Sequence, residues 1–227
     1  MSDPVVVIGA SAEQKLPALV CEHSILRHCP EAKVVQVFDR EMPRWSGGMG
    51  TPFSFVRHWV PELCGNQGRA IYLDSDMIVF ASVRGLWDLP MDGAAVLYSP
   101  AQFSVLIIDC EILYPWPLSV VLDDLEAGRI SYAQVMQMGY LSGRWKRPSV
   151  PDEWNRLDLY EPNTSLLHYT NMRRQPWLAE GHPLAGWWFA ELVGACASGL
   201  VTAEIVAEEI AAGHVISAVA EELKCRL

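Results

Sequence analysis

Short, mostly apolar runs recur along the chain, and each is bounded by polar or turn-forming residues. Runs of four or five such residues without strict alternation are typical of strands that are covered on both faces. The runs occupy residues 5–8, 34–38, 70–73, 77–80, 94–97, 105–108 and 166–169. This pattern predicts a fold with a buried centre made of strands.

Segments with the helical spacing of apolar residues separate several of these runs. Ser11 and Gln14 have the spacing of a capping box, and a helix is predicted from there to about Cys29. Thr51-Pro52 predicts the start of a second helix, which ends near Cys64. Further helices are predicted over residues 82–87, 120–127, 132–138, 184–196 and 202–223. The opening order of strand, helix and strand implies parallel strands with a crossover helix, so we expect an α/β fold.

Length, composition and charge narrow the classes of partner. The 227 residues suffice for one domain with a substantial core, and 51% of them are hydrophobic against 19% charged. The formal net charge of −10 argues against electrostatic binding to nucleic acid or to anionic lipid. An acidic protein still binds a polyphosphate where a metal ion or a local arginine supplies positive charge.

Nothing in the sequence predicts export or insertion into a membrane. Residues 1–4 contain no basic group ahead of the first apolar run, and no apolar stretch is long enough for a transmembrane segment. The six cysteines are scattered, without a Cys-x-x-Cys pair. We therefore expect free thiols and a cytoplasmic location.

The sequence Asp74-Ser75-Asp76 lies between two predicted strands and is the strongest candidate for chemistry. In an extended chain, residues two apart point to one face, about 7 Å apart along the strand. Two carboxylates in that arrangement can reach one hard cation. Asp-Ser-Asp is also good turn chemistry, so a solvated turn between two strands is an equal alternative on these residues alone.

His168 and two arginine positions are ambiguous in the same way. A histidine that ends an apolar run is more often a hydrogen-bonded core residue than a ligand, although it is a suitable third donor for Mn²⁺. Arg173-Arg174 is a basic turn that can face solvent or meet phosphate charge. Arg57, on the second predicted helix, is either a surface charge or a substrate contact.

Five segments, in order along the chain, resemble the family 8 glycosyltransferases. They span residues 23–28, 53–63, 69–76, 151–155 and 168–177. Members of this family are retaining enzymes of the GT-A fold that use nucleotide sugars and Mn²⁺. The resemblance implies a single GT-A domain over residues 1–195, with a mixed, mainly parallel central sheet. Residues 196–227 lie beyond the resemblance and are expected to form a helical extension packed on that domain. A homodimer interface or a role in contacting the acceptor is the alternative.

The resemblance also implies roles for individual residues. Asp74, Asp76 and His168 would hold Mn²⁺, or Mg²⁺, against the diphosphate of a UDP-sugar donor. Gln134 is the candidate for a group on the reacting face of the sugar. Contacts to the nucleotide or its diphosphate are implied for Gly9, Ala10, Ser11, Arg57, Ser75 and Arg174. The acceptor is not indicated, and a saccharide, a lipid-linked sugar and a protein all remain open.

The chain departs from the family pattern at several places, among them residues 102–104 and Asn171, and two further departures bear on its activity. The family's Asp-Gln pair is Ala133-Gln134 here, and its lysine before Pro-Trp is Gln175. Arg174 falls at the lysine spacing when counted from His168, and we expect it to replace that charge. These departures keep open a nucleotide-sugar-binding protein with impaired catalysis. A purely structural α/β protein, in which Asp-Ser-Asp is only a turn, is the third alternative.

Overall fold

The first strand, helix and strand form the parallel unit that the sequence predicts. In the computed structural model, which describes all residues except 1, 42–44, 46, 48–50 and 227, β1 (Val5–Gly9) pairs in parallel with β2 (Lys33–Gln36). A 3₁₀ turn (Ala12–Gln14) and α1 (Lys15–His28) connect them. Gln14 Oε1 accepts the Ser11 N–H at 3.2 Å, as expected for a capping box.

The central sheet contains six strands in the order β2-β1-β3-β6-β5-β7. Its β1–β3 and β5–β7 pairs are parallel, like β1–β2, whereas β6 runs antiparallel to both β3 and β5. The added strands are β3 (Arg69–Asp74), β5 (Val96–Tyr98), β6 (Val105–Asp109) and β7 (Lys146–Arg147). The predicted mixed, mainly parallel sheet is confirmed.

A second, smaller sheet continues from the end of β3. It has the order β4-β9-β8, with β4 (Met77–Val79) antiparallel to β9 (Leu166–His168) and β8 (Arg156–Leu157) parallel to β9. Asp74-Ser75-Asp76 therefore carries the chain from one sheet to the other and is not a hairpin turn. This crossing keeps the segment buried.

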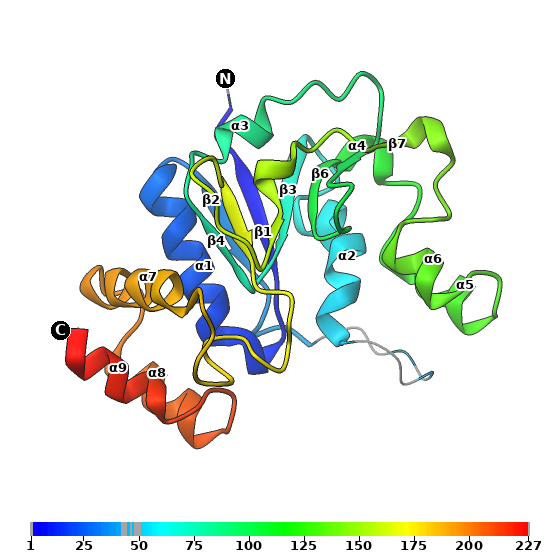
Figure 1. Cartoon of the computed structure of the whole chain (residues 1–227). Helices are drawn as coiled ribbons and strands as arrows, with labels where there is room; N and C mark the ends of the chain where they lie inside the picture. The colour runs from blue at the N-terminus through cyan, green and yellow to red at the C-terminus, as the bar shows by residue number, and fades with distance from the viewer. Residues whose placement is uncertain (1, 42–44, 46, 48–50, 227) are drawn as a thin grey trace.

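Helices cover both faces of the central sheet (Figure 1). α1 and α7 (Ala185–Ala197) lie on one side and α2 (Val56–Leu63) on the other. Along β1, Ile8 belongs to the core cluster beside α1 and Val7 to the cluster beside α2, as expected when successive side chains alternate across a strand. The remaining α-helices of this part are α3 (Arg84–Trp87), α4 (Cys110–Leu113), α5 (Leu118–Glu126) and α6 (Tyr132–Met136).

The C-terminal stretch differs from its prediction. The single helix expected over residues 202–223 is wrong, because the structure has α8 (Ala203–Ala211) and α9 (Ala218–Arg226) with a turn between them. Gly213 stands in the turn with a φ of +75°, a conformation that favours glycine, and it ends α8. The Ile216 N–H then bonds to the Trp177 carbonyl at 2.9 Å, which ties the turn to the domain.

Both C-terminal helices pack on the main body of the protein. Val206 of α8 and Val219 and Leu223 of α9 are buried in the same core cluster as α1 and α7. No helix within the described residues has the length and apolar character that crossing a membrane requires.

Candidate metal centre

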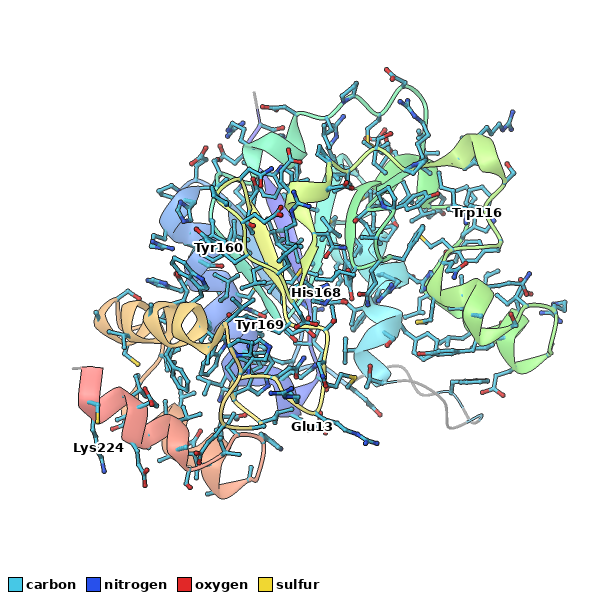
Figure 2. The ribbon with its side chains drawn as sticks, in the orientation of Figure 1. Glu13, Trp116, Tyr160, His168, Tyr169 and Lys224 are labelled. Carbon is cyan, nitrogen blue, oxygen red and sulfur yellow. The ribbon has the colours of Figure 1, made fainter. Side chains whose placement is uncertain are left out.

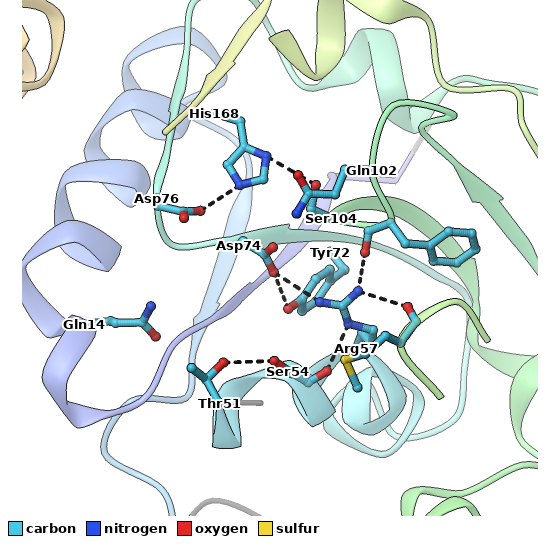
Figure 3. Close-up of polar contacts among 12 residues, drawn as sticks. Gln14, Thr51, Ser54, Arg57, Tyr72, Asp74, Asp76, Gln102, Ser104 and His168 are labelled. Atoms are coloured by element: carbon cyan, nitrogen blue, oxygen red, sulfur yellow. Dashed lines mark hydrogen bonds and ion pairs between the residues drawn. The ribbon is translucent and has the colours of Figure 1, made fainter. Parts of the chain in front are cut away.

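Three strand ends bring Asp74, Asp76 and His168 together (Figure 3). Asp74 is the last residue of β3, and Asp76 immediately precedes β4. The β4–β9 register pairs Met77 with His168, and the Tyr169 N–H bonds to the Asp76 carbonyl at 2.9 Å. Backbone pairing therefore fixes His168 beside Asp76, near the centre of the molecule (Figure 2).

The three side chains have the geometry of a cation site. Their ligand atoms all lie within 4.8 Å of one another, and His168 Nε2 is 3.1 Å from Asp76 Oδ1. Atoms that share one cation through bonds of about 2.1 Å lie roughly 3 to 4.2 Å apart. Two carboxylates and one imidazole suit Mn²⁺ and related divalent ions. The donor set therefore fits a divalent cation.

The burial of the three side chains distinguishes this site from a solvated turn. The exposed fraction is 7% for Asp74, 9% for Asp76 and 2% for His168. Buried carboxylates are unfavourable unless positive charge or hydrogen bonds compensate them. The interpretation of Asp-Ser-Asp as a turn with both carboxylates in water is therefore wrong.

His168 is oriented by a polar network on its far side. His168 Nδ1 lies 3.1 Å from Asn155 Oδ1 and 3.3 Å from Ser104 Oγ. The Asn155 amide donates to Ser104 Oγ and to the Gln102 carbonyl, both at 3.2 Å. A proton on Nδ1 donates to Asn155 and leaves the Nε2 lone pair facing the carboxylates, the usual arrangement of a metal-binding histidine.

The protonation of His168 reflects the acidic side of the site. Burial by itself lowers the pKa of His168, but the Asp76 and Asp74 carboxylates outweigh burial and raise that pKa above its ordinary value. Without a cation, the imidazole therefore binds a proton more readily. A cation and a proton compete for the same nitrogen.

Asp74 is held by a tyrosine and an arginine. The Tyr72 hydroxyl donates to Asp74 Oδ1 at 2.6 Å, and Arg57 Nη2 lies 3.6 Å from the same oxygen. Burial raises the pKa of Asp74, whereas the Arg57 charge works in the opposite direction. Gly9 leaves room for the tyrosine, because a Cβ at this position would clash with the Tyr72 hydroxyl.

Arg57 also connects three segments around the site. Its Nε donates to the Ser54 carbonyl at 2.9 Å, and its Nη1 donates to the carbonyls of Phe103 and Met136. The residue is buried, so these carbonyls and Asp74 together compensate its charge. Arg57 thus joins the start of α2, the loop before β6 and the end of α6.

Gln175 contacts the site although it departs from the family pattern. Its Nε2 donates to Asp76 Oδ2 and to the Tyr169 carbonyl, both at 2.8 Å. Neither Gln175 nor Asn155 was predicted to act at the metal centre. Gln175 lies in the segment 168–177 and Asn155 in the segment 151–155, both of which resemble the family. That location was the feature of the sequence that could have indicated a role at the site.

A cavity of about 700 Å³ opens beside these side chains. Asp74, Asp76, His168 and Arg57 form one wall, and the volume is in the range of small-molecule sites. The other walls include aromatic, polar and basic side chains: Phe103, Tyr98, Tyr132, Gln137 and Lys146. Tyr98 and Phe103 stack with ring centroids 4.3 Å apart.

The remaining predicted site residues are not among those that line this cavity. Gly9 is the last residue of β1 and pairs with Asp74 of β3, and Ala10 and Ser11 follow the strand. Ser75 is buried, and its Oγ has no hydrogen-bond partner among the described residues.

Gln134 and Arg174 lie outside the cavity wall. Gln134 Oε1 accepts the Ser131 N–H at 2.8 Å in the capping box of α6, and Gln137 on the same helical segment lines the cavity instead. Arg174 is exposed, although Thr170 and Met172 of the same segment line the cavity. The roles assigned to Gln134 and Arg174 stay predictions.

The mixed sheet, its flanking helices and the buried Asp-x-Asp define a GT-A glycosyltransferase fold, and solved structures share it. The chain aligns with the glycosyltransferase GlyE of Streptococcus pneumoniae TIGR4 at 17% identity and a TM-score of 0.62, covering 88% of this chain and 64% of that one. It aligns with the galactosyltransferase LgtC in complex with donor and acceptor sugar analogs at 16% identity and a TM-score of 0.63, covering 87% and 96%. At these identities the likeness establishes the fold.

The family follows from the sequence. Residues 7–107 match the family model described as Glycosyl transferase family 8, which confirms the predicted resemblance over this part of the chain. The matched segment contains Arg57, Asp74 and Asp76, whereas His168 lies beyond it. No curated protein matches the chain at a significant level.

Proposed function

We propose that this protein transfers a hexose from a UDP-sugar to an acceptor with retention of the anomeric configuration. The observation that carries the proposal is the buried Asp74, Asp76 and His168 cluster on the wall of a 700 Å³ cavity, in a chain with a family 8 segment. In this proposal residues 1–195 form the transferase domain, and residues 196–227 form a helical extension.

Asp74, Asp76 and His168 are the proposed ligands of Mn²⁺, or of Mg²⁺. When bound, such an ion neutralises the negative charge that develops on a departing nucleoside diphosphate. The protein supplies the orientation: Asn155 positions the His168 ring, and Gln175 and Tyr72 position Asp76 and Asp74. Because these partners are in place before a ligand arrives, little ordering is needed when the cation binds.

The cavity walls support binding of a nucleotide sugar. Arg57 and Lys146 line the cavity and offer positive charge to phosphate oxygens, in a protein whose overall charge is negative. We assign Arg174 to the same task, since its segment continues from the cavity wall at Thr170 and Met172. The nucleotide is proposed to reach the carboxyl edge of the central sheet, where ligands bind in open α/β folds. The contacts assigned there are Gly9, Ala10, Ser11 and Ser75.

Catalytic impairment is the second candidate function. Ala133 stands where the family has an aspartate near the donor sugar, and the Gln134 side chain is engaged in the capping box of α6. A protein with these features and an intact metal site would bind a nucleotide sugar without transferring it. Donor hydrolysis separates the two candidates.

The experiment incubates the protein with UDP-glucose or UDP-galactose and Mn²⁺, and follows free sugar by proton NMR. A transferase is expected to release sugar slowly to water, with the α anomer appearing first and with complete dependence on the metal. Asp76→Asn is the matched inactive control. Binding of UDP without any release from either donor would contradict transferase activity and support the binding protein.

A further inference from the structure

Three aromatic side chains gather beyond the end of β4 that is farther from Asp76. The Phe80 ring centroid lies 5.2 Å from that of Tyr160 and 5.3 Å from that of Trp187, and the Tyr160 and Trp187 centroids are 4.5 Å apart. Trp187 is nevertheless 40% exposed. In Figure 2, Tyr160 lies on the α1 side of the molecule, apart from His168. The cluster therefore presents an indole to solvent while its two neighbours hold the ring in place.

Two adjoining cavities extend from this cluster along α1 and α7. The first, of about 350 Å³, is lined by Trp187 and Phe80 at one end and by His23 and Arg27 at the other. The second, of about 500 Å³, shares His23 and Arg27 and continues to Leu200. We call these two cavities, which share His23 and Arg27 as lining residues, the α1–α7 groove. It shares no lining residue with the cavity at the candidate metal centre.

Polar side chains are built into the floor of the α1–α7 groove. Glu191 is 5% exposed, and its two carboxylate oxygens bond to His23 Nδ1 at 2.5 Å and to Arg27 Nη2 at 2.8 Å. The Arg27 side chain is 47% exposed, so guanidinium donors beyond the one used for Glu191 face the groove and solvent. His28 also lines the first cavity, and its Nε2 is buried without a hydrogen-bond partner among the described residues.

A glycine within α7 makes room for this arrangement. A Cβ at Gly194 would lie 2.6 Å from Cε1 of His23, so any side chain there would displace the imidazole. Glycine inside a helix is destabilising relative to alanine, because it loses more backbone freedom on folding. The sequence thus places an unfavourable helix residue where it allows the His23 and Glu191 pair to form.

We propose that the α1–α7 groove binds a neutral oligosaccharide, with one hexose ring stacked on Trp187 and hydroxyl groups bonded to Arg27. A sugar ring offers an apolar face of C–H groups and an edge of hydroxyls, and the groove offers an exposed aromatic ring beside donors. Arg27 and Glu191 cancel in formal charge, which favours a neutral ligand. Two adjoining cavities suit more than one sugar unit.

The test titrates maltotriose, cellotriose and lactose into the full chain at millimolar concentrations, with tryptophan fluorescence and saturation-transfer NMR as readouts. At least one of the three sugars is expected to bind in the absence of UDP and metal. Trp187→Ala is expected to weaken that binding about tenfold, because the stacking surface is removed. Trp187→Phe retains an aromatic face and is expected to lose less.

Two controls assign the sugar binding to Trp187 and to the α1–α7 groove. Leu159→Ala removes another exposed apolar side chain near Tyr160 and is expected to leave sugar affinity unchanged. UDP binding in the presence of Mn²⁺ is expected to be equal in the wild type and in Trp187→Ala. A wrong assignment of sugar binding to the groove can therefore be told apart from a wrong assignment of nucleotide binding to the metal centre. Absence of binding of all three sugars, or equal affinity in Trp187→Ala, would overturn the proposal.

Discussion

Asp74 and Asp76 are both buried, and two ionised carboxylates so close together repel each other. Neutral hydrogen-bond donors reduce this electrostatic cost without removing it. The Tyr72 hydroxyl donates to Asp74, and the Gln175 amide donates to Asp76. The pKa of Asp74 is nevertheless raised, first by burial. A divalent cation supplies the missing positive charge, which is why we interpret the pair as a metal site.

Asp76→Asn tests this interpretation at one residue. The amide keeps the shape of the side chain but removes a ligand charge, so Mn²⁺-dependent UDP affinity is expected to fall about tenfold or more. The melting temperature without metal is expected to stay equal or rise, because a buried repulsion is relieved. Asp88→Asn, at an exposed position, is the matched control. Unchanged UDP affinity in Asp76→Asn would contradict the assignment of Asp76 as a ligand.

Gln175→Leu tests whether the Gln175 amide supports Asp76 in binding the metal. The substitution leaves Asp76 Oδ2 without its amide donor at 2.8 Å, and loss of such a partner typically weakens metal affinity 10- to 100-fold. We expect about a tenfold weaker Mn²⁺ affinity in the absence of UDP, measured by electron paramagnetic resonance. Arg174→Ala is expected to leave that affinity unchanged and to weaken UDP binding. The reverse pattern would show that Arg174, and not Gln175, acts on the metal ligands.

The sequence indicated the candidate ligands more readily than the residues that support them. The carboxylate pair at Asp74 and Asp76 is visible between two apolar runs, and the family resemblance added His168 to it. Asn155 and Gln175 are ordinary amides whose function depends on which side chain lies opposite. For Gln175 that partner is set by the β4–β9 pairing, which brings together residues about 90 positions apart, and for Asn155 it is set by the β8–β9 pairing. Local patterns reveal neither pairing.

Among the secondary-structure elements, α2 joins the site to the surrounding core. It carries Arg57 into the cavity wall and, on the next residue, His58, whose Nδ1 lies 2.7 Å from the Tyr140 hydroxyl. His58 is fully buried, and burial, followed by the neighbouring Arg57 charge, lowers its pKa to about 3. The imidazole therefore stays neutral in the folded protein at any pH near neutrality.

His58 makes the stability of the protein dependent on pH. Between the ordinary pKa of 6.5 and the folded pKa of about 3, the unfolded chain binds a proton that the folded chain does not. The free energy of unfolding therefore falls as the pH is lowered below 6.5. From pH 7 to pH 5 this histidine contributes a loss of about 2 kcal/mol, at about 1.4 kcal/mol per pH unit.

The measurement is urea unfolding of the wild type and of His58→Asn at pH 7 and pH 5. The asparagine amide can still meet the Tyr140 hydroxyl but does not titrate, so the pH-dependent loss is expected to be about 2 kcal/mol smaller in the variant. Equal losses in the two proteins would mean that His58 is protonated in the folded state.

Element positions followed from local patterns, but their assembly did not. The runs at residues 70–73 and 77–80 were correctly predicted as strands, yet they belong to different sheets, and an apolar run does not specify its partner strand. The break between α8 and α9 was missed because apolar residues continue at helical spacing through Gly213. Glycine alone is tolerated in helices, so the turn needed the tertiary bond from Ile216 to Trp177 to define it.

At the scale of the whole molecule, the C-terminal helices share the core of the transferase fold. Val219 of α9 is fully buried in the cluster that also contains residues of α1 and α7. The division at residue 195 thus stays a prediction about function, while the packing is continuous.

Val219→Ala measures what this packing contributes. Removal of two buried methyl groups is expected to lower the free energy of unfolding by about 2 kcal/mol, from lost burial and the cavity left behind. UDP affinity of the folded variant is expected to stay unchanged, because Val219 does not line the cavity of the candidate metal centre. Glu208→Ala, at an exposed position of α8, is the control. A loss as small as that of the control would mean that α9 does not stabilise the domain.

The central claim is a metal-dependent nucleotide site at Asp74, Asp76 and His168, and calorimetric titration of UDP with and without Mn²⁺ tests it most directly. Micromolar binding that requires Mn²⁺ is the predicted result. Absence of binding under both conditions would contradict the claim and leave a structural α/β protein as the better description.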